Sequence, residues 1–324
     1  MAEIKAEKMA TRQAYGKTLV ELGKTTPNLV VMDADLSKST MTAEFGKAYP
    51  ERFFNMGIAE QNLYGTACGL ALSGKVVCAS TFAMFAAGRA FEIIRNSIGY
   101  THANVKICAT HAGITVGEDG ASHQTFEDIA LMRTIPGMTV LNPSDGVSAR
   151  ALIKQAVAFD GPAYIRLGRA AVPTFYTEEM AAKLKIGKGV CLRTGDKKDG
   201  KLADATVIAT GIMVNEAMLA AEELTADGIE VRVIDMHTIK PLDADIIYRA
   251  ARETGAIVTA EEHSVIGGLG SAVAEVTATH YPVKMAMVGQ QDTFGESGKP
   301  EELKAKYGMT AADIVRAVKL LIEA

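Results

Sequence analysis

The sequence has no tryptophan, few aromatic residues and no excess of basic charge. Of its 324 residues 6% are aromatic, and the net charge is −4. Without a basic patch, neither nucleic acid nor a membrane surface is expected as a partner. No apolar run approaches the roughly 18 to 20 residues that span a bilayer, and the charged start MAEIKAEKMATRQAYGK lacks the apolar segment of a secretory signal. We therefore expect a cytoplasmic protein.

Several sequence motifs typical of nucleotide-binding and metal-binding enzymes are also missing. There is no P-loop, which argues against an ATPase of that type, and no G-x-G-x-x-G follows a strand. There is also no H-E-x-x-H or similar metal-ligand spacing, so we expect this chain to hold no metal of its own. The four cysteines form no C-x-x-C pair and are expected to be reduced thiols: Cys68, Cys78, Cys108 and Cys191.

The hydrophobic pattern alternates strand-like runs with amphipathic helical stretches, which predicts parallel sheets flanked by helices. Strands are expected at 29–35, 75–81, 105–111, 138–144 and 163–168, and again at 205–211, 230–236, 256–262 and 283–289. The pattern lapses in the polar stretch 172–189. We expect an α/β protein with two mainly parallel, doubly wound domains, at 1–175 and 191–324, joined by a linker at 176–190.

Polar residues gather where the strands of the first domain are expected to end, and in open α/β sheets ligands bind at these ends. They are Asp33, Asp35, Ser80, Thr81, His111, Arg166 and Arg169. Loop 110–128 adds Glu118, Asp119 and His123 among three glycines, which let backbone approach a ligand closely. The two imidazoles could donate hydrogen bonds to sugar hydroxyls or shuttle protons near neutral pH; the alternative is a solvated surface loop.

Two further features stand beside this loop. Phe82 and Phe85 directly follow a predicted strand, so they are either core residues or a stacking platform for a flat heterocycle. Glu60 is the one acid in an otherwise apolar, small or amide stretch, NMGIAEQNLYG. It is either the polar edge of a helix or a carboxyl kept away from water, where apolar neighbours would favour its proton-sharing form.

Taken in order, the motifs resemble transketolases over essentially the whole chain. The matching motifs are IAEQN (58–62), STFAMF (80–85), THAGITVGEDGASHQ (110–124), NPSDG (142–146), RLGR (166–169), VIDMHTIKPLD (233–243) and EEHSVIGGLGSAVAE (261–275). The resemblance is to the pyrimidine-binding and C-terminal domains of that family.

The resemblance implies a role for each matching residue. Glu60 matches the catalytic glutamate that hydrogen-bonds and activates the aminopyrimidine ring of thiamine diphosphate, while Phe82, Phe85 and Asp35 match cofactor-binding positions. The substrate-binding positions implied are Arg12, Ser39, His111, Asp119, His123 and Arg169, with His111 and His123 also catalytic. His263, in the EEH motif, has no catalytic counterpart and is expected to be structural.

The resemblance also implies a partner. The family holds the diphosphate and Mg²⁺ in an N-terminal domain through a G-D-G motif that this sequence does not show in the right context. We expect a separate N-terminal subunit to hold the divalent ion and diphosphate, and self-association of this chain through its pyrimidine domain, giving an α2β2 assembly. The implied reaction is transfer of a two-carbon ketol unit from a ketose phosphate to an aldose phosphate, as in the pentose phosphate pathway.

Three alternatives remain open from the sequence. The chain could be the beta subunit of the decarboxylase component of a 2-oxo acid dehydrogenase, which would act on pyruvate or branched-chain oxo acids. It could resemble a deoxyxylulose-phosphate synthase, although VGEDG followed by SHQ favours transketolase. It could also be a non-catalytic assembly or regulatory subunit, which would be expected to lose Glu60 or the loop histidines.

Overall fold

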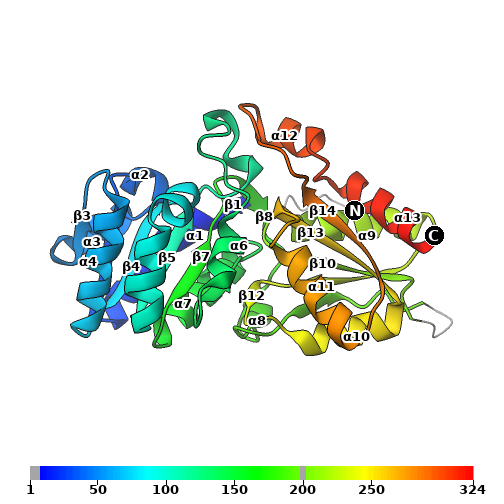
Figure 1. The fold of residues 1–324 in the computed structure, drawn as a ribbon, viewed down its shortest axis with the longest axis horizontal. Coiled ribbons are helices and arrows are strands. Elements are labelled where there is room, and N and C mark those ends of the chain that lie inside the picture. The colour runs from blue at the N-terminus through cyan, green and yellow to red at the C-terminus, as the bar shows by residue number, and fades with distance from the viewer. Residues whose placement is uncertain (1–7, 198–201, 324) are drawn as a thin grey trace.

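Two α/β lobes lie side by side in the computed structural model, which describes residues 8–197 and 202–323 (Figure 1). The first lobe holds a seven-stranded sheet in the order β12-β6-β7-β5-β4-β2-β3. Its strands are β2 (Leu29–Asp33), β3 (Phe53–Asn55), β4 (Val76–Phe82), β5 (Val105–Thr110), β6 (Thr139–Leu141), β7 (Ala163–Arg166) and β12 (Thr238–Lys240). All neighbours in this sheet are parallel except β12, which runs antiparallel to β6.

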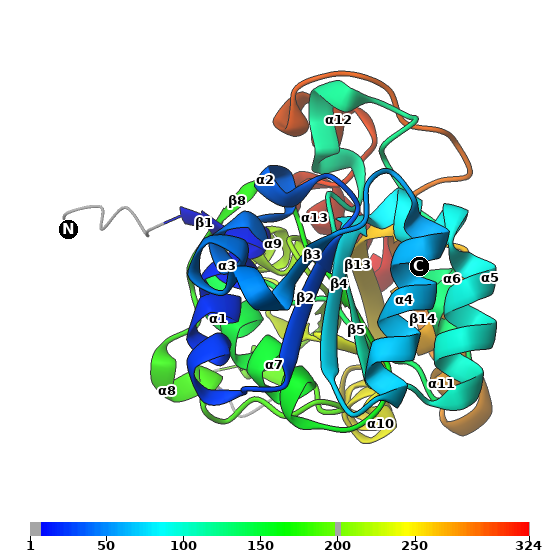
Figure 2. The same cartoon turned by 90° about the vertical axis from the view of Figure 1, so that its left-hand side faces the viewer.

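Helices cover both faces of this sheet because its strands are apolar on both sides. Val31 and Cys78 face a cluster with α1 (Thr11–Thr25), α3 (Ala43–Ala48) and α7 (Gly146–Ala158). Their neighbours Met32 and Ala79 face the opposite cluster, with α4 (Glu60–Leu72) and α6 (Asp128–Thr134). Figure 2 shows these strands in the middle, with α1 and α3 on one side and α4 on the other.

The second lobe is a five-stranded sheet in the order β14-β13-β10-β11-β9. Its strands are β9 (Val190–Arg193), β10 (Ala205–Ala209), β11 (Val231–Asp235), β13 (Ala256–Ser264) and β14 (Lys284–Gln290), and only β9 is antiparallel. Its helices are α9 (Met213–Ala226), α10 (Ala244–Thr254), α11 (Leu269–His280), α12 (Pro300–Lys306) and α13 (Ala311–Glu323). Helices α9 and α13 pack on one face; α10 and α11 join the core that also holds α4 and α6. The predicted fold class is confirmed.

Short elements join the two lobes. β1 (Lys8–Ala10) pairs with β8 (Ala171–Pro173), and α8 (Glu178–Ala181) lies within the predicted linker. Tyr176 and Leu184 are buried in the cluster under α1 and α7, so the described linker residues pack against the first lobe. The domain boundaries themselves stay a prediction.

The stretch after β4 is not a regular α-helix. It runs through a π-helical turn, η2 (Phe85–Arg89), the short α5 (Phe91–Ile93) and a second π-helical segment, η3 (Ile94–Gly99). Two short turns complete the first lobe, α2 (Ser37–Thr40) and η1 (Pro50–Arg52), together with the 3₁₀ turn η4 (Ile114–Asp119). π-helical turns are often found at functional sites. Among the described residues, no helix is long and apolar enough to cross a membrane.

Candidate active site

Four of the predicted site residues form one aromatic cluster at the carboxyl edge of the first sheet. The ring of Phe82, the last residue of β4, stacks on His111 with centroids 3.9 Å apart and on Phe85 at 5.9 Å. His123 meets Phe85 edge-on at 5.3 Å. Strand β4 and loop 111–124, predicted separately to carry function, are therefore brought together.

Glu60 reaches this cluster through a residue that the sequence did not single out. Glu60 is the first residue of α4, where the helix dipole favours a negative charge. Nη1 of Arg89 donates to both carboxylate oxygens of Glu60, at 3.0 and 3.1 Å. The guanidinium carbon of Arg89 also lies 4.5 Å from the centre of the Phe85 ring. One planar cation thus spans the carboxylate and the aromatic ring.

The surroundings of Glu60 correct one expectation. Its side chain is 3% exposed, so the carboxyl is kept from water. The surroundings are less apolar than expected because Ile58 is 77% exposed and Gly65 is exposed, although Leu63 is buried. Arg89 neutralises the buried carboxylate instead, as such a charge requires.

His111 lies in a positive field. Burial first, and then the charges of Arg12, Arg169 and His123, together lower the pKa of His111 from 6.5 to about 3. His111 is thus a neutral imidazole at neutral pH, with Nδ1 2.9 Å from the Thr110 hydroxyl. It can exchange hydrogen bonds with a ligand, and its expected part in proton transfer stays a prediction.

The two arginines approach from different elements. Nη1 of Arg12, on α1, donates to the carbonyl oxygen of Ser39 at 2.6 Å. Its Nε is buried, and no atom of the described chain accepts a hydrogen bond from it. Nη1 of Arg169 donates to Val116 O at 2.7 Å and to Glu118 at 2.8 Å. Burial lowers the pKa of Arg12 most, and the positive charge of Arg169 lowers it further, as expected for two cations held close together.

Loop 111–124 is held down by the second lobe. Oε1 of Glu262, on β13, accepts a hydrogen bond of 2.6 Å from the Thr115 amide. Gly113 has φ +80°, and a Cβ there would lie 2.3 Å from the Glu262 carboxyl carbon, so only glycine lets the two approach. Nε2 of Gln124 donates to Glu296 O at 2.9 Å. The loop that carries the two histidines is therefore shaped by contacts between the lobes.

His263 belongs to this support. Its Nε2 accepts from the Ile129 amide at the start of α6, at 3.1 Å, while Nδ1 lies 2.7 Å from Ser264 O. Both ring nitrogens are thus used by the backbone. Arg166 also joins the lobes, because it binds Asp128 at 2.8 Å and Glu262 O at 2.8 Å. These contacts fit the structural role expected for His263.

Asp35 and Asp119 occupy exposed positions at the same end of the sheet. Oδ1 of Asp35 accepts from the Asn55 amide group at 3.0 Å. Asp35 and His111 both have positive φ, +64° and +57°, which non-glycine residues rarely adopt and which clusters at functional sites. Asp33, by contrast, is buried and bound to Thr40 and Thr42, and burial raises its pKa to about 6.

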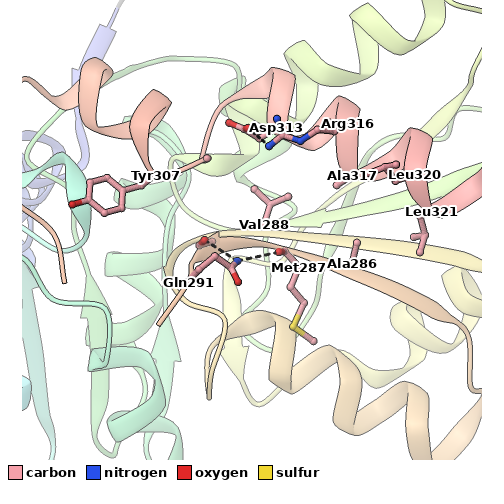
Figure 3. Close-up of a pocket in the computed structure, with 12 residues that line it drawn as sticks. Ala286, Met287, Val288, Gln291, Tyr307, Asp313, Arg316, Ala317, Leu320 and Leu321 are labelled. Carbon is pink, nitrogen blue, oxygen red and sulfur yellow. Dashed lines mark hydrogen bonds and ion pairs between the residues drawn. The ribbon is translucent and has the colours of Figure 1, made fainter. Parts of the chain in front are cut away.

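A pocket elsewhere on the molecule contains none of these residues. It lies between β14 and α13, where Asp313 and Arg316 form an ion pair of 2.7 Å (Figure 3). Within residues 8–197 and 202–323, no group of three or more His, Cys, Asp or Glu side chains is placed to hold a metal ion.

Sequence reasoning missed Arg89 and Glu262. Arg89 follows the aromatic pair by one turn, yet its partner Glu60 is 29 residues away, which no local pattern reveals. Glu262 stands in the EEH motif, where the histidine drew attention instead.

Comparison with known proteins identifies both lobes. Residues 7–174 match the family model described as "Transketolase, pyrimidine binding domain". Residues 197–314 match "Transketolase, C-terminal domain".

Individual relatives match over nearly their full length. The chain is 51% identical over 308 residues to the "Putative transketolase C-terminal section" of Methanocaldococcus jannaschii, covering 95% of this chain and 94% of that protein. It is 42% identical to the "6-deoxy-6-sulfo-D-fructose transketolase subunit SqwH" of Clostridium sp., covering 99% and 97%. A solved structure, "Split gene transketolase, inactive beta4 tetramer", superposes with a TM-score of 0.89 at 55% identity, covering 97% of this chain and 99% of that one. The chain therefore belongs to the transketolase family, in which it corresponds to the pyrimidine-binding and C-terminal domains.

Proposed function

We propose that this chain is the C-terminal subunit of a two-chain transketolase, which transfers a two-carbon ketol unit from a ketose phosphate to an aldose phosphate. The observation that carries the proposal is the pairing of a buried carboxylate, Glu60, with the partly exposed ring of Phe85. Together they offer a hydrogen-bond acceptor and a stacking surface to one flat ligand. A pyrimidine-binding domain in this family implies binding of thiamine diphosphate.

The residues present fit the aminopyrimidine end of that cofactor. A planar guanidinium already bonds to Glu60 and lies over Phe85, so the site accommodates a flat nitrogen-bearing group. When bound, thiamine diphosphate supplies the nucleophilic carbon that carries the two-carbon unit. Glu60 would hold the ring through a short hydrogen bond and share a proton with it. Phe85 would stack on the ring, and Phe82 would support Phe85 and His111 from below.

The remaining site residues are suited to a sugar phosphate. The charges of Arg12 and Arg169 both lower the pKa of His111, so a phosphate near this histidine would meet two guanidinium groups. The buried Arg12 Nε, to which the described chain offers no acceptor, is a donor available to such an anion. Ser39, Asp119 and Asp35 lie at the same end of the sheet. His111 would contact the substrate as a neutral hydrogen-bonding group, with His123 beside it.

A second chain is part of this proposal. One relative is described as a C-terminal section and another as a subunit, and both match this chain nearly end to end. A separate N-terminal subunit would hold the diphosphate and a divalent ion such as Mg²⁺.

Self-association of the chain has its own support on α4. Gly65 and Gly69 lie on one exposed face of this helix, and a Cβ at either position would meet nothing within 4 Å. Leu72, on the same helix, is 63% exposed, and Tyr100, which follows η3, is 91% exposed. Small residues at this spacing let a second backbone approach closely, and the solved relative is described as a beta4 tetramer. With two N-terminal subunits, pairing through α4 would give an α2β2 assembly.

Reconstitution tests the proposal. The chain is mixed with its N-terminal subunit, thiamine diphosphate and Mg²⁺, and ketol transfer between a ketose phosphate and an aldose phosphate is followed. Glu60→Gln should lower the rate by about 100-fold or more, whereas Glu222→Gln, at an exposed position of α9, should not change it. Full activity of Glu60→Gln would refute the role of Glu60. Turnover of pyruvate in place of ketol transfer would favour a 2-oxo acid dehydrogenase subunit.

A further inference from the structure

Arg89 occupies the two groups to which the proposed aminopyrimidine would bind. We infer that Arg89 closes the pyrimidine subsite of this chain and that its guanidinium must leave Glu60 and Phe85 before the cofactor ring can bind. This inference rests on the proposed function, because that function assigns the subsite. Beyond that function, it assigns a role to Arg89 and describes a closed state of the pyrimidine subsite.

The closed state follows from the contacts of one side chain. Both oxygens of Glu60 accept a hydrogen bond from Arg89 Nη1, at 3.0 and 3.1 Å. Among the described residues, no other basic side chain forms an ion pair with Glu60. The guanidinium lies 4.5 Å from the ring centre of Phe85, close to the separation of stacked planar groups. A second flat ligand cannot use the same face of the ring and the same oxygens while Arg89 remains there.

Arg89 covers the buried carboxylate of Glu60 on the side that faces solvent. The Glu60 side chain is 3% exposed and that of Arg89 is 51% exposed. The carboxylate is thus covered, while the group bound to it faces solvent. A ligand that reaches Glu60 from this side has to displace a cation, and the buried carboxylate then needs a new hydrogen-bond donor from the ligand.

The local backbone and side chain permit this movement. Arg89 ends the π-helical turn η2 and follows Gly88, and both residues are exposed. An arginine of this kind can swing into water, and the cost of the movement is the ion pair that the buried Glu60 carboxylate loses. A ligand that donates a hydrogen bond to Glu60 offsets this cost, and because it binds only the open form it shifts the population toward that form.

Binding of a neutral aminopyrimidine tests the inference without diphosphate, metal or turnover. Wild-type chain, Arg89→Ala and Arg95→Ala are titrated with 2-methyl-4-aminopyrimidine by calorimetry. Removal of the competing guanidinium should tighten binding by about three- to thirtyfold in Arg89→Ala, which is the size of the cation–ring contact that the ligand no longer has to displace. Arg95→Ala should bind as wild type does, because exposed Arg95 lies on the neighbouring segment η3 and donates its hydrogen bond to Asn96.

A second readout follows the side chain itself. In wild-type chain the Arg89 Nε–H resonance in an NMR spectrum should shift as the heterocycle is added, while that of Arg95 should not. Should Arg89→Ala fold poorly in a thermal melt, Arg89→Gln removes the charge with a smaller change of volume, and the same tightening is expected.

The outcomes separate the inference from the proposed function. Glu60→Gln should weaken binding in both wild-type and Arg89→Ala backgrounds. If no variant binds the heterocycle, or if Glu60→Gln has no effect, the pyrimidine subsite is wrong and the inference falls with it. If binding depends on Glu60 but Arg89→Ala binds equally or more weakly, the proposed function stands and the inference is overturned.

Discussion

Phe82 and Phe85 are three positions apart, yet they have different environments. Phe82 is 6% exposed and stacks on His111, so its ring is part of the support beneath the site. Phe85 is partly exposed and presents one face to the Arg89 guanidinium. We therefore expect the ring of Phe82 to stabilise the fold and the ring of Phe85 to contact a ligand.

Leucine substitutions should separate these roles. Phe85→Leu is expected to weaken thiamine diphosphate binding to the assembled enzyme by about two- to tenfold, the size of a stacking contribution, with little change in stability. Phe82→Leu is expected to lower the free energy of unfolding by about 1–2 kcal/mol. Cofactor titrations and urea unfolding check both. Equal destabilisation by the two variants, with no loss of affinity in Phe85→Leu, would contradict the distinction.

A buried acid far from the reaction should govern part of the pH dependence of stability. Oδ2 of Asp235 accepts from the Tyr176 hydroxyl at 2.8 Å and from the Ser144 hydroxyl, while Oδ1 has no partner in the described chain. Burial raises the pKa of Asp235 from 3.8 to about 7. The folded state therefore keeps this proton where the unfolded state loses it, so the contribution of Asp235 to stability declines as pH rises toward 7.

Asp235→Asn removes this loss because the amide is neutral at every pH. Relative to wild type, the variant should gain about 2 kcal/mol of unfolding free energy between pH 5 and pH 8. Urea unfolding at the two pH values gives the difference. A wild-type-to-variant difference that does not change with pH would show that Asp235 is ionised in the folded chain.

At the scale of elements, the main strands of both sheets and the glycine-rich loop could be predicted, and the short edge strands β3 and β12 could not. β4 and β13 were predicted because continuous apolar runs mark strands covered on both faces. β3 and β12 have three residues each, too few to show a period, and they exist because a neighbouring strand offers its free edge. The shape of loop 111–124 was also beyond prediction, since Glu262 of the second lobe sets it.

Gly113 tests how strongly the lobes shape that loop. Gly113→Ala should lower the free energy of unfolding by about 2–3 kcal/mol, because the new Cβ meets Glu262 in addition to the backbone strain. Gly228→Ala is the matched control, since Gly228 has the same φ of +80° with nothing within 4 Å; it should cost about 1 kcal/mol. Equal costs would mean that the contact with Glu262 yields without penalty.

At the scale of the whole molecule, the exposed glycine face of α4 should control assembly. Gly69→Glu places a charge on that face and is expected to shift the chain toward monomers in sedimentation velocity experiments. The helix should tolerate the change, because glutamate is a better helix former than glycine. Leu219→Glu, at a 47% exposed position on α9, is the control and should leave the oligomer unchanged. An unchanged oligomer in Gly69→Glu would exclude α4 as the contact.

Strand β12 links the two lobes through their sheets. It follows β11 in the chain, yet it leaves the second sheet and closes the open edge of the first sheet at β6. Cutting the chain at the linker would strip that edge of its cover, and an uncovered strand edge invites pairing with other chains. The two domains match separate sequence families, yet a strand that follows β11 of the second sheet completes the first sheet. We therefore expect the two domains to depend on each other for folding, so that a break in a transketolase chain is better tolerated before the pyrimidine-binding domain than after it.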